Sequence, residues 1–203
     1  MRLIIITTFA AQLVVADAAV IQLDNNKGVD TNFITDNAGV KIAKGNAAIA
    51  LGYFGDLADN EIADFSSFIQ VGNTYVNFFQ GTDGFFDTNL DATQSGITVD
   101  FTAGGSDESA IGKNVFIVIG DNTTDLTQSG DWLVFKSTEI YVGGASPGPS
   151  AVRLANGEGT LIKGLFGNTG SSVSEYSLVT VPEPSSIALL GLGLVGFTLR
   201  RRR

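Results

Sequence analysis

The sequence predicts a mainly β protein. We expect an antiparallel β-sandwich-like body with one short helix, preceded by a signal peptide and followed by a C-terminal transmembrane helix. Short apolar runs rich in Val, Ile and Phe recur between clusters of Gly, Asn, Asp and Ser, which is typical of a sandwich. Both ends of the 203-residue chain are apolar, while the segment between them is acidic. The pattern therefore divides the chain into residues 1–18, 19–181 and 182–203.

The N-terminal segment has the three parts of a secretory signal. Arg2 gives a positive start, residues 3–15 are largely apolar, and Ala16 and Ala18 supply the small residues that a signal peptidase reads. We expect cleavage after Ala18. The alternative is that residues 3–6 form a buried first strand of the body.

The body contains eight apolar runs that suit strands and one that suits a helix. We expect strands at residues 20–23, 47–53, 74–79, 97–101, 114–119, 132–136, 161–163 and 175–181. A helix is predicted at residues 57–69. Its apolar residues fall on one face, and its acidic residues lie in the first turns, where the helix dipole favours anions. The apolar set is Ile62, Phe65, Phe68 and Ile69, and the acidic set is Asp59, Glu61 and Asp64.

The body is strongly acidic. Without Arg2 and the four terminal arginines it has seven basic residues, and without Asp17 and Glu183 it has 19 acidic ones, so its net charge is about −12. Phosphate backbones attract proteins of the opposite sign, and this charge excludes nucleic-acid binding. It suits an exported protein that is soluble or attracts divalent cations.

The chain has no histidine and no cysteine, which excludes the common catalytic triads and ordinary zinc sites. A pair of carboxylates is the one catalytic arrangement left open, because glycoside hydrolysis needs only two acids. The candidates are Glu61, Glu108, Glu139 and Glu158. Their Gly- and Ser-rich surroundings are typical of solvated turns, so we expect no enzyme and no catalytic residue.

Calcium is the cofactor that the sequence leaves open. Asp87, Asn89 and Asp91 place oxygen ligands at alternate positions, as in the first half of an EF-hand loop. The pattern then breaks, since Ala92 replaces the turning glycine and Thr98 the closing glutamate. The alternative is a structural turn in which Asp and Asn bind their own backbone. The same choice applies to a second acidic loop, which contains Asp121, Asn122, Asp125 and Asp131.

Aromatic residues raise the question of carbohydrate binding. Trp132 is the only tryptophan, and the run from Asp131 to Lys136 is apolar on both faces, which favours a core strand. The pairs Phe78-Phe79 and Phe85-Phe86 flank a Gly-rich turn, so one ring of each pair points away from the core. An exposed ring there would suit a partner, and a second packed layer explains the pairs equally well.

The C-terminal segment has three parts in a fixed order. Pro182, Glu183 and Pro184 come first, an apolar helix at residues 185–199 follows, and Arg200, Arg201, Arg202 and Arg203 end the chain. The apolar run at 187–199 spans about 20 Å as a helix, short of the hydrocarbon thickness of about 30 Å. The arginines act as a membrane stop and stay on the cytoplasmic side by the positive-inside rule, which leaves the body outside.

This order of motif, helix and arginines resembles the PEP-CTERM sorting signal of Gram-negative bacteria. The resemblance implies that an exosortase recognises Pro182, Glu183 and Pro184 and acts at or near them. It also implies transient anchoring in the inner membrane, followed by transfer of the body to the cell surface or to an extracellular polysaccharide matrix. Two alternatives remain open: a carbohydrate- or calcium-binding module of that matrix, and a glycoside hydrolase that uses a carboxylate pair.

Overall fold

The computed structural model describes residues 19–27, 30–75, 83–90, 93–144, 147–170 and 173–181. Within these ranges the chain is mainly β, with three sheets and four 3₁₀ helices of a single turn each. The sheets form a sandwich-like body, so the predicted fold class is confirmed at this level. None of the described helices is long and apolar enough to cross a membrane. The predicted signal peptide and transmembrane helix lie outside the described residues.

The central sheet is antiparallel and has the strand order β10-β8-β7-β4-β5. Its strands are β10 (Gly159–Lys163), β8 (Asp131–Ile140), β7 (Asn114–Gly120), β4 (Ala48–Tyr53) and β5 (Ile69–Tyr75). A short strand, β13 (Val179–Thr180), also pairs with β8. All six residues of β4 and the last six of β7 are buried. Their apolar side chains cover both faces of the sheet, and both faces must therefore be packed against other elements.

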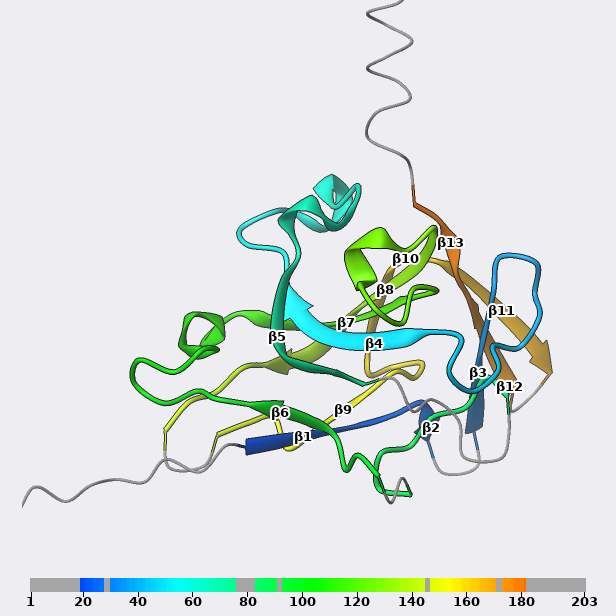
Figure 1. Cartoon of the computed structure of the whole chain (residues 1–203). Helices are drawn as coiled ribbons and strands as arrows, with labels where there is room; N and C mark the ends of the chain where they lie inside the picture. Colours follow the sequence, from blue (N-terminus) through cyan, green and yellow to red (C-terminus); the bar gives the residue numbers. More distant parts are fainter. Residues whose placement is uncertain are drawn as a thin grey trace, which may run out of the picture.

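A second layer lies under the central sheet in Figure 1. It consists of β6 (Ile97–Val99), β1 (Ala19–Asp24) and β9 (Ala151–Arg153). Strand β1 pairs antiparallel with β6 and parallel with β9, so the body is not purely antiparallel. The two layers share one apolar core, to which they contribute Ile21, Ile97, Val152, Ile117 and Leu133, among others.

Close approach between the layers requires a glycine in β5. Gly72 has a φ of +69°, and a Cβ there would lie 2.3 Å from the carbonyl oxygen of Thr98 on β6. Its backbone N–H donates to Oδ1 of the buried Asp107, whose Oδ2 accepts from the backbone N–H of Asp100. One carboxylate thus ties β5 to the segment that follows β6.

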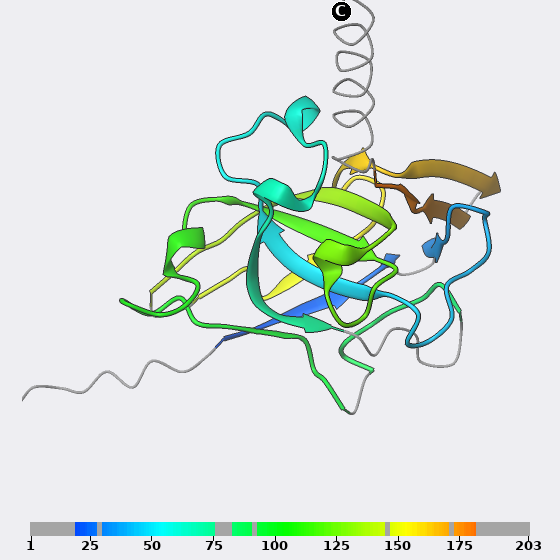
Figure 2. The ribbon, with the colours of Figure 1, turned by 45° about the horizontal axis from the view of Figure 1, so that its top comes forward.

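A third sheet stands beside the other two (Figure 2). Its strands are β11 (Leu165–Gly170), β12 (Val173–Ser177), β3 (Asp30–Thr35) and β2 (Asn26–Lys27). Gly164, with a φ of +125°, separates β10 of the central sheet from β11 of this sheet. Strands β11 and β12 form an antiparallel hairpin in the third sheet, and β13, which follows β12, pairs with β8 of the central sheet. The chain thus leaves the central sheet after β10 and returns to it at β13. The pairing of β12 with β3 is parallel.

The predicted helix at residues 57–69 is wrong. The segment forms two 3₁₀ turns, η1 (Asp59–Glu61) and η2 (Phe65–Ser67), and Ile69 begins β5 opposite Tyr53. Between the turns Asp64 is extended, and its carboxylate accepts from the backbone N–H of Ser66. The hydrogen bonds from the side chain and backbone of Ser66 lower the pKa of Asp64. This cap interrupts a continuous helix.

The two turns nevertheless cover the outer face of the central sheet. Trp132 and Lys136 lie on this face of β8, and the ring of Phe65 stacks 4.8 Å from that of Trp132. The remaining turns are η3 (Glu108–Ala110) and η4 (Leu126–Gln128). Trp132 is 1% exposed, which confirms its prediction as a core residue.

Most predicted strands correspond to observed ones, with shifts at the ends. Residues 20–23, 47–53, 97–101, 114–119, 132–136 and 161–163 match β1, β4, β6, β7, β8 and β10. The run at 74–79 begins too late, since β5 already starts at Ile69, and its residues 76–79 lie outside the described part. The run at 175–181 divides into β12 and β13. Strands β2, β3, β9 and β11 were not predicted.

Candidate functional site

The end of the described chain is built into the central sheet. Val179 and Thr180 of β13 pair with Trp132 and Asp131 of β8. The backbone N–H of Val181 donates to the carbonyl of Gly130 at 2.8 Å. The residue before the strand, Leu178, is fully buried. The fold therefore holds the chain up to the residue that precedes the predicted sorting motif.

Side chains reinforce this junction. The amide of Asn37 donates to Oδ1 of Asp131 at 3.1 Å and to Oγ1 of Thr180 at 3.4 Å. The backbone N–H of Leu178 donates to the carbonyl of Thr35 at 2.9 Å. Contacts from β8 and from the end of β3 thus fix β13 on two sides. The sorting residues Pro182, Glu183 and Pro184, the arginines 200–203, and Ala16 and Ala18 lie outside the described residues.

The first calcium candidate forms a turn in the part that is described. Oδ1 of Asp87 accepts from the backbone N–H of Asn89, and its carbonyl accepts from that of Leu90. Thr88 is buried and accepts from the backbone N–H of Leu23. Asp91 lies outside the described residues, so the three predicted ligands are not all placed.

The second acidic loop also directs its oxygens at its own backbone. Oδ1 of Asp121 accepts from the backbone N–H groups of Gly130 and Asp131, and Asp125 accepts from Thr127. Oδ1 of Asn122 accepts from two further N–H groups. Among the described residues, no three acidic side chains are grouped as metal ligands.

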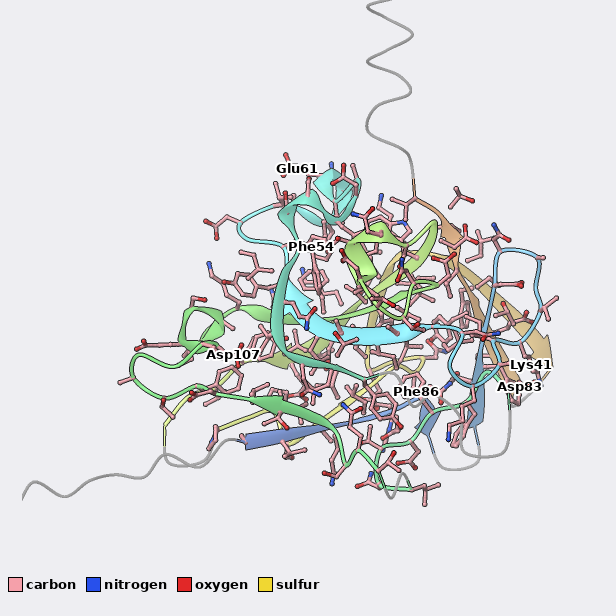
Figure 3. The ribbon with its side chains drawn as sticks, in the orientation of Figure 1. Lys41, Phe54, Glu61, Asp83, Phe86 and Asp107 are labelled. Atoms are coloured by element: carbon pink, nitrogen blue, oxygen red, sulfur yellow. The ribbon has the colours of Figure 1, made fainter. Side chains whose placement is uncertain are left out.

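The four candidate glutamates have two different environments. Glu61, which is labelled in Figure 3, accepts from the backbone N–H of Ala58. Glu108 accepts from the backbone N–H of Gly104. Glu139 and Glu158, in contrast, line one pocket of about 160 Å³. The structure therefore brings together two of the four carboxylates and leaves Glu61 and Glu108 apart from them.

An ion pair that the sequence did not predict lies in the same pocket. The guanidinium of Arg153 binds the carboxylate of Asp24 through two bonds, Nε to Oδ1 at 2.6 Å and Nη2 to Oδ2 at 3.0 Å. The bond to Asp24, and the charges of Asp24, Glu158 and Asp87, raise the pKa of Arg153. One permanent cation, Arg153 of β9, thus sits among the carboxylates of Asp24, Asp87 and Glu158.

A second cleft, larger than this pocket, also joins residues far apart in sequence. It has a volume of about 290 Å³ and lies between the end of β4, the start of β7 and the middle of β8. We call it the lysine cleft, because Lys113 and Lys136 line it. The other lining residues are Tyr53, Phe54, Gly55, Asp56, Leu57, Asp59, Gly112, Asn114 and Phe116.

Each lysine of the cleft forms an ion pair with the loop after β4. Nζ of Lys113 lies 2.9 Å from Oδ1 of Asp56, and Nζ of Lys136 lies 2.9 Å from Oδ1 of Asp59. The hydrogen bond and charge of Asp56 raise the pKa of Lys113. No sequence spacing indicates this cleft, since it depends on the register that places Phe116 opposite Lys136.

The comparisons with known proteins concern the C-terminus. Residues 180–203 match the family model described as the PEP-CTERM protein-sorting motif. No curated protein and no solved structure matches the chain. The match confirms the interpretation of the C-terminal segment as a sorting signal of the kind that an exosortase processes. Such a signal implies export and processing at the membrane.

Proposed function

We propose that this chain, which carries a PEP-CTERM protein-sorting motif at residues 180–203, is an exported protein without catalytic activity of its own. A signal peptidase removes residues 1–18, and the C-terminal segment holds the protein in the inner membrane. An exosortase then acts at or near Pro182, Glu183 and Pro184. The β-rich body is delivered to the cell surface or to an extracellular polysaccharide matrix.

The match to the sorting motif carries this proposal, and the junction at β13 supports it. The motif begins at Thr180, which pairs with Asp131 in the central sheet. A cut at or beyond Pro182 would therefore release a body that keeps its last strand. The pairing of β13 and the bond of Val181 to Gly130 lie within residues 19–181, so we expect the body to keep its fold after the segment is removed.

The hydrogen bonding of the acidic residues supports the absence of catalysis. Glu61 and Glu108 accept from the backbone of their own turns. Glu139 and Glu158 share a pocket, and the Arg153–Asp24 ion pair occupies part of it. The glycoside hydrolase alternative depends on Glu139 and Glu158, because these two glutamates line a common pocket.

The proposal is tested in a host that contains an exosortase. The Glu183→Ala variant removes the charge at the centre of the motif, so we expect it to accumulate in the inner membrane with its tail intact. The wild-type body should instead reach the surface or medium without the tail. Mass spectrometry of the mature protein reads both ends at once.

A matched control replaces an exposed glutamate of the body. Glu139→Ala removes the same charge far from the motif in sequence, and it should be processed like the wild type. A wild-type protein that stays in the cytosol with both ends present would contradict the proposal. Equal processing of the Glu183→Ala variant would show that Glu183 has no part in recognition.

A further inference from the structure

The lysine cleft brings together two of the few basic residues of an acidic body. Two of the seven basic residues of the body, Lys113 and Lys136, line one cleft of about 290 Å³. Asp56 and Asp59 balance their charge, so the cleft is locally neutral while the body carries about −12. An anionic ligand that the rest of the surface repels is therefore tolerated here.

The ion pair at the mouth of the cleft is easily exchanged. The side chain of Asp56 is 94% exposed and that of Lys113 is 38% exposed. Exposed ion pairs contribute little to stability, because water and salt screen them. A ligand carboxylate can replace Asp56 on the Lys113 ammonium at little cost, and Asp56 then returns to water.

The second lysine is held more firmly. Lys136 is 29% exposed, and its ammonium contacts both carboxylate oxygens of Asp59, at 2.9 and 3.2 Å. It also lies 5.8 Å from the ring centre of Phe116. Phe116 packs edge-to-face on Phe54, which is labelled in Figure 3, with 5.2 Å between the ring centres. Both residues are buried. The two buried rings and the ion pair thus hold the Lys136 ammonium, a donor, and the Asp59 carboxylate, an acceptor, in place before a ligand binds.

The remaining polar groups of the cleft select the class of anion. Asp59 accepts hydrogen bonds and repels a dianion such as phosphate, but it pairs with the hydroxyl groups of a ligand. Asn114 is exposed at the rim and offers both a donor and an acceptor. The cleft is at the lower limit of ligand sites, about 300 Å³, which suits a ligand the size of one sugar ring.

We propose that the lysine cleft binds a hydroxylated carboxylate of the uronic-acid type, either free or as a residue of an acidic saccharide. Lys113 takes the ligand carboxylate. Lys136 and Asn114 donate to ring and hydroxyl oxygens, and Asp59 accepts from hydroxyl groups. This inference concerns the body alone and does not depend on the sorting of the chain.

The test uses the full chain in detergent micelles, labelled with ¹⁵N and titrated with galacturonic acid. We expect saturable shifts of the backbone amides of Gly55, Gly112, Lys113 and Asn114. The methyl ester of galacturonic acid lacks the negative charge, so we expect it to bind the wild type about tenfold more weakly than the free acid does. We expect the same tenfold loss when the free acid is added to Lys113→Ala or to Lys136→Ala. A tenfold change in affinity corresponds to about 1.4 kcal/mol. Lys113→Arg retains the cation and should retain binding.

Matched controls distinguish binding from general charge effects. Lys163→Ala removes a lysine of β10 outside the cleft and should bind galacturonic acid like the wild type. Spectra of each variant without ligand verify the fold. Titration with an oligosaccharide of galacturonic acid tests whether the ligand is a free sugar acid or a residue of an acidic saccharide. Stronger binding of the oligosaccharide than of the monomer would indicate the saccharide.

Three results would overturn the proposal. The first is the lack of saturable shifts at millimolar galacturonic acid. The second is unchanged affinity in both Lys113→Ala and Lys136→Ala. The third is inorganic phosphate binding as well as galacturonic acid, which would mean that the cleft selects charge alone.

Discussion

At the scale of single residues, buried polar side chains hold this fold together by binding backbone groups. Asn25 is fully buried, and its amide donates to the carbonyls of Asn32 and Gly84 while its Oδ1 accepts from the backbone N–H of Phe86. Three chain segments therefore meet at one side chain. A buried polar group is tolerated only when such bonds replace those to water.

A buried tyrosine gives a prediction about alkaline pH. Tyr176 is 3% exposed and packs against Phe135 and Phe166. Burial raises its pKa from 10.0 to about 12. Between these values the unfolded chain has already lost the phenol proton and the folded chain has kept it, so stability falls as pH rises from about 10 to 12.

Tyr176→Phe removes this proton and keeps the ring. We expect the variant to lose less stability than the wild type between pH 10 and 12, as measured by urea denaturation followed by circular dichroism. Near neutral pH the phenol is protonated in both states and the titration contributes nothing, so the pH dependence isolates it from any change in packing. Identical slopes for both proteins above pH 10 would contradict the prediction.

At the scale of elements, strands that are apolar on both faces were predicted well from the sequence. Continuous apolar runs produced β4, β7 and β8, because only a buried central position accommodates them. Strands β3 and β11 are mixed with Asp, Asn, Thr and Gly, and β9 has only three residues. Strand β3 pairs with β12, and β9 pairs with β1, and these partners lie far along the chain, where no local pattern shows them.

The segment at residues 54–69 shows how tertiary contacts override a local pattern. Helical spacing of apolar residues predicted a helix. Instead, Ile62 is buried from the extended residue after η1, Phe65 is buried from η2, and Ile69 belongs to β5. Pairing of Ile69 with Tyr53 and capping by Asp64 satisfy the backbone groups that a helix would have used. The apolar residues Ile62 and Phe65 are therefore buried without forming one face of a continuous helix.

Phe65 carries the contact between this segment and the central sheet. Phe65→Ala should lower the free energy of unfolding by about 3 kcal/mol or more, as for other buried phenylalanines. Because Trp132 is the only tryptophan and stacks on Phe65, its fluorescence should also shift to longer wavelength. The control Leu57→Ala removes a 39% exposed side chain of the same segment. A Trp132 spectrum that is the same in Phe65→Ala and the wild type would refute the role of Phe65.

At the scale of the whole molecule, the C-terminal sorting signal could be predicted from the sequence, but the clefts of the body could not. The sorting signal is a local pattern that works as a contiguous segment, so the sequence contains it entirely. The lysine cleft and the Arg153–Asp24 pair join residues from separate strands and depend on register. The sequence shows these residues but not their proximity.

The folded body should end at Val181. Leu178 is fully buried, β13 pairs with β8, and Val181 donates to Gly130, so these residues belong to the sheet although the sorting motif begins at Thr180. A chain of residues 19–181 should be as stable as the full chain in detergent. A chain of residues 19–177 should lose about 2–5 kcal/mol, the cost of removing a buried leucine.

Urea denaturation at constant temperature compares the two truncated chains. A lower midpoint for residues 19–177 with an unchanged slope would place the loss in the native state. Asn37→Ala in the longer chain removes the amide that binds Asp131 and Thr180, and it should reduce stability less than the truncation, because both contacts are exposed. If the two truncated chains unfold at the same urea concentration, β13 contributes nothing to the body. The folded body would then end at β12, and a cut well before Pro182 would leave the fold intact.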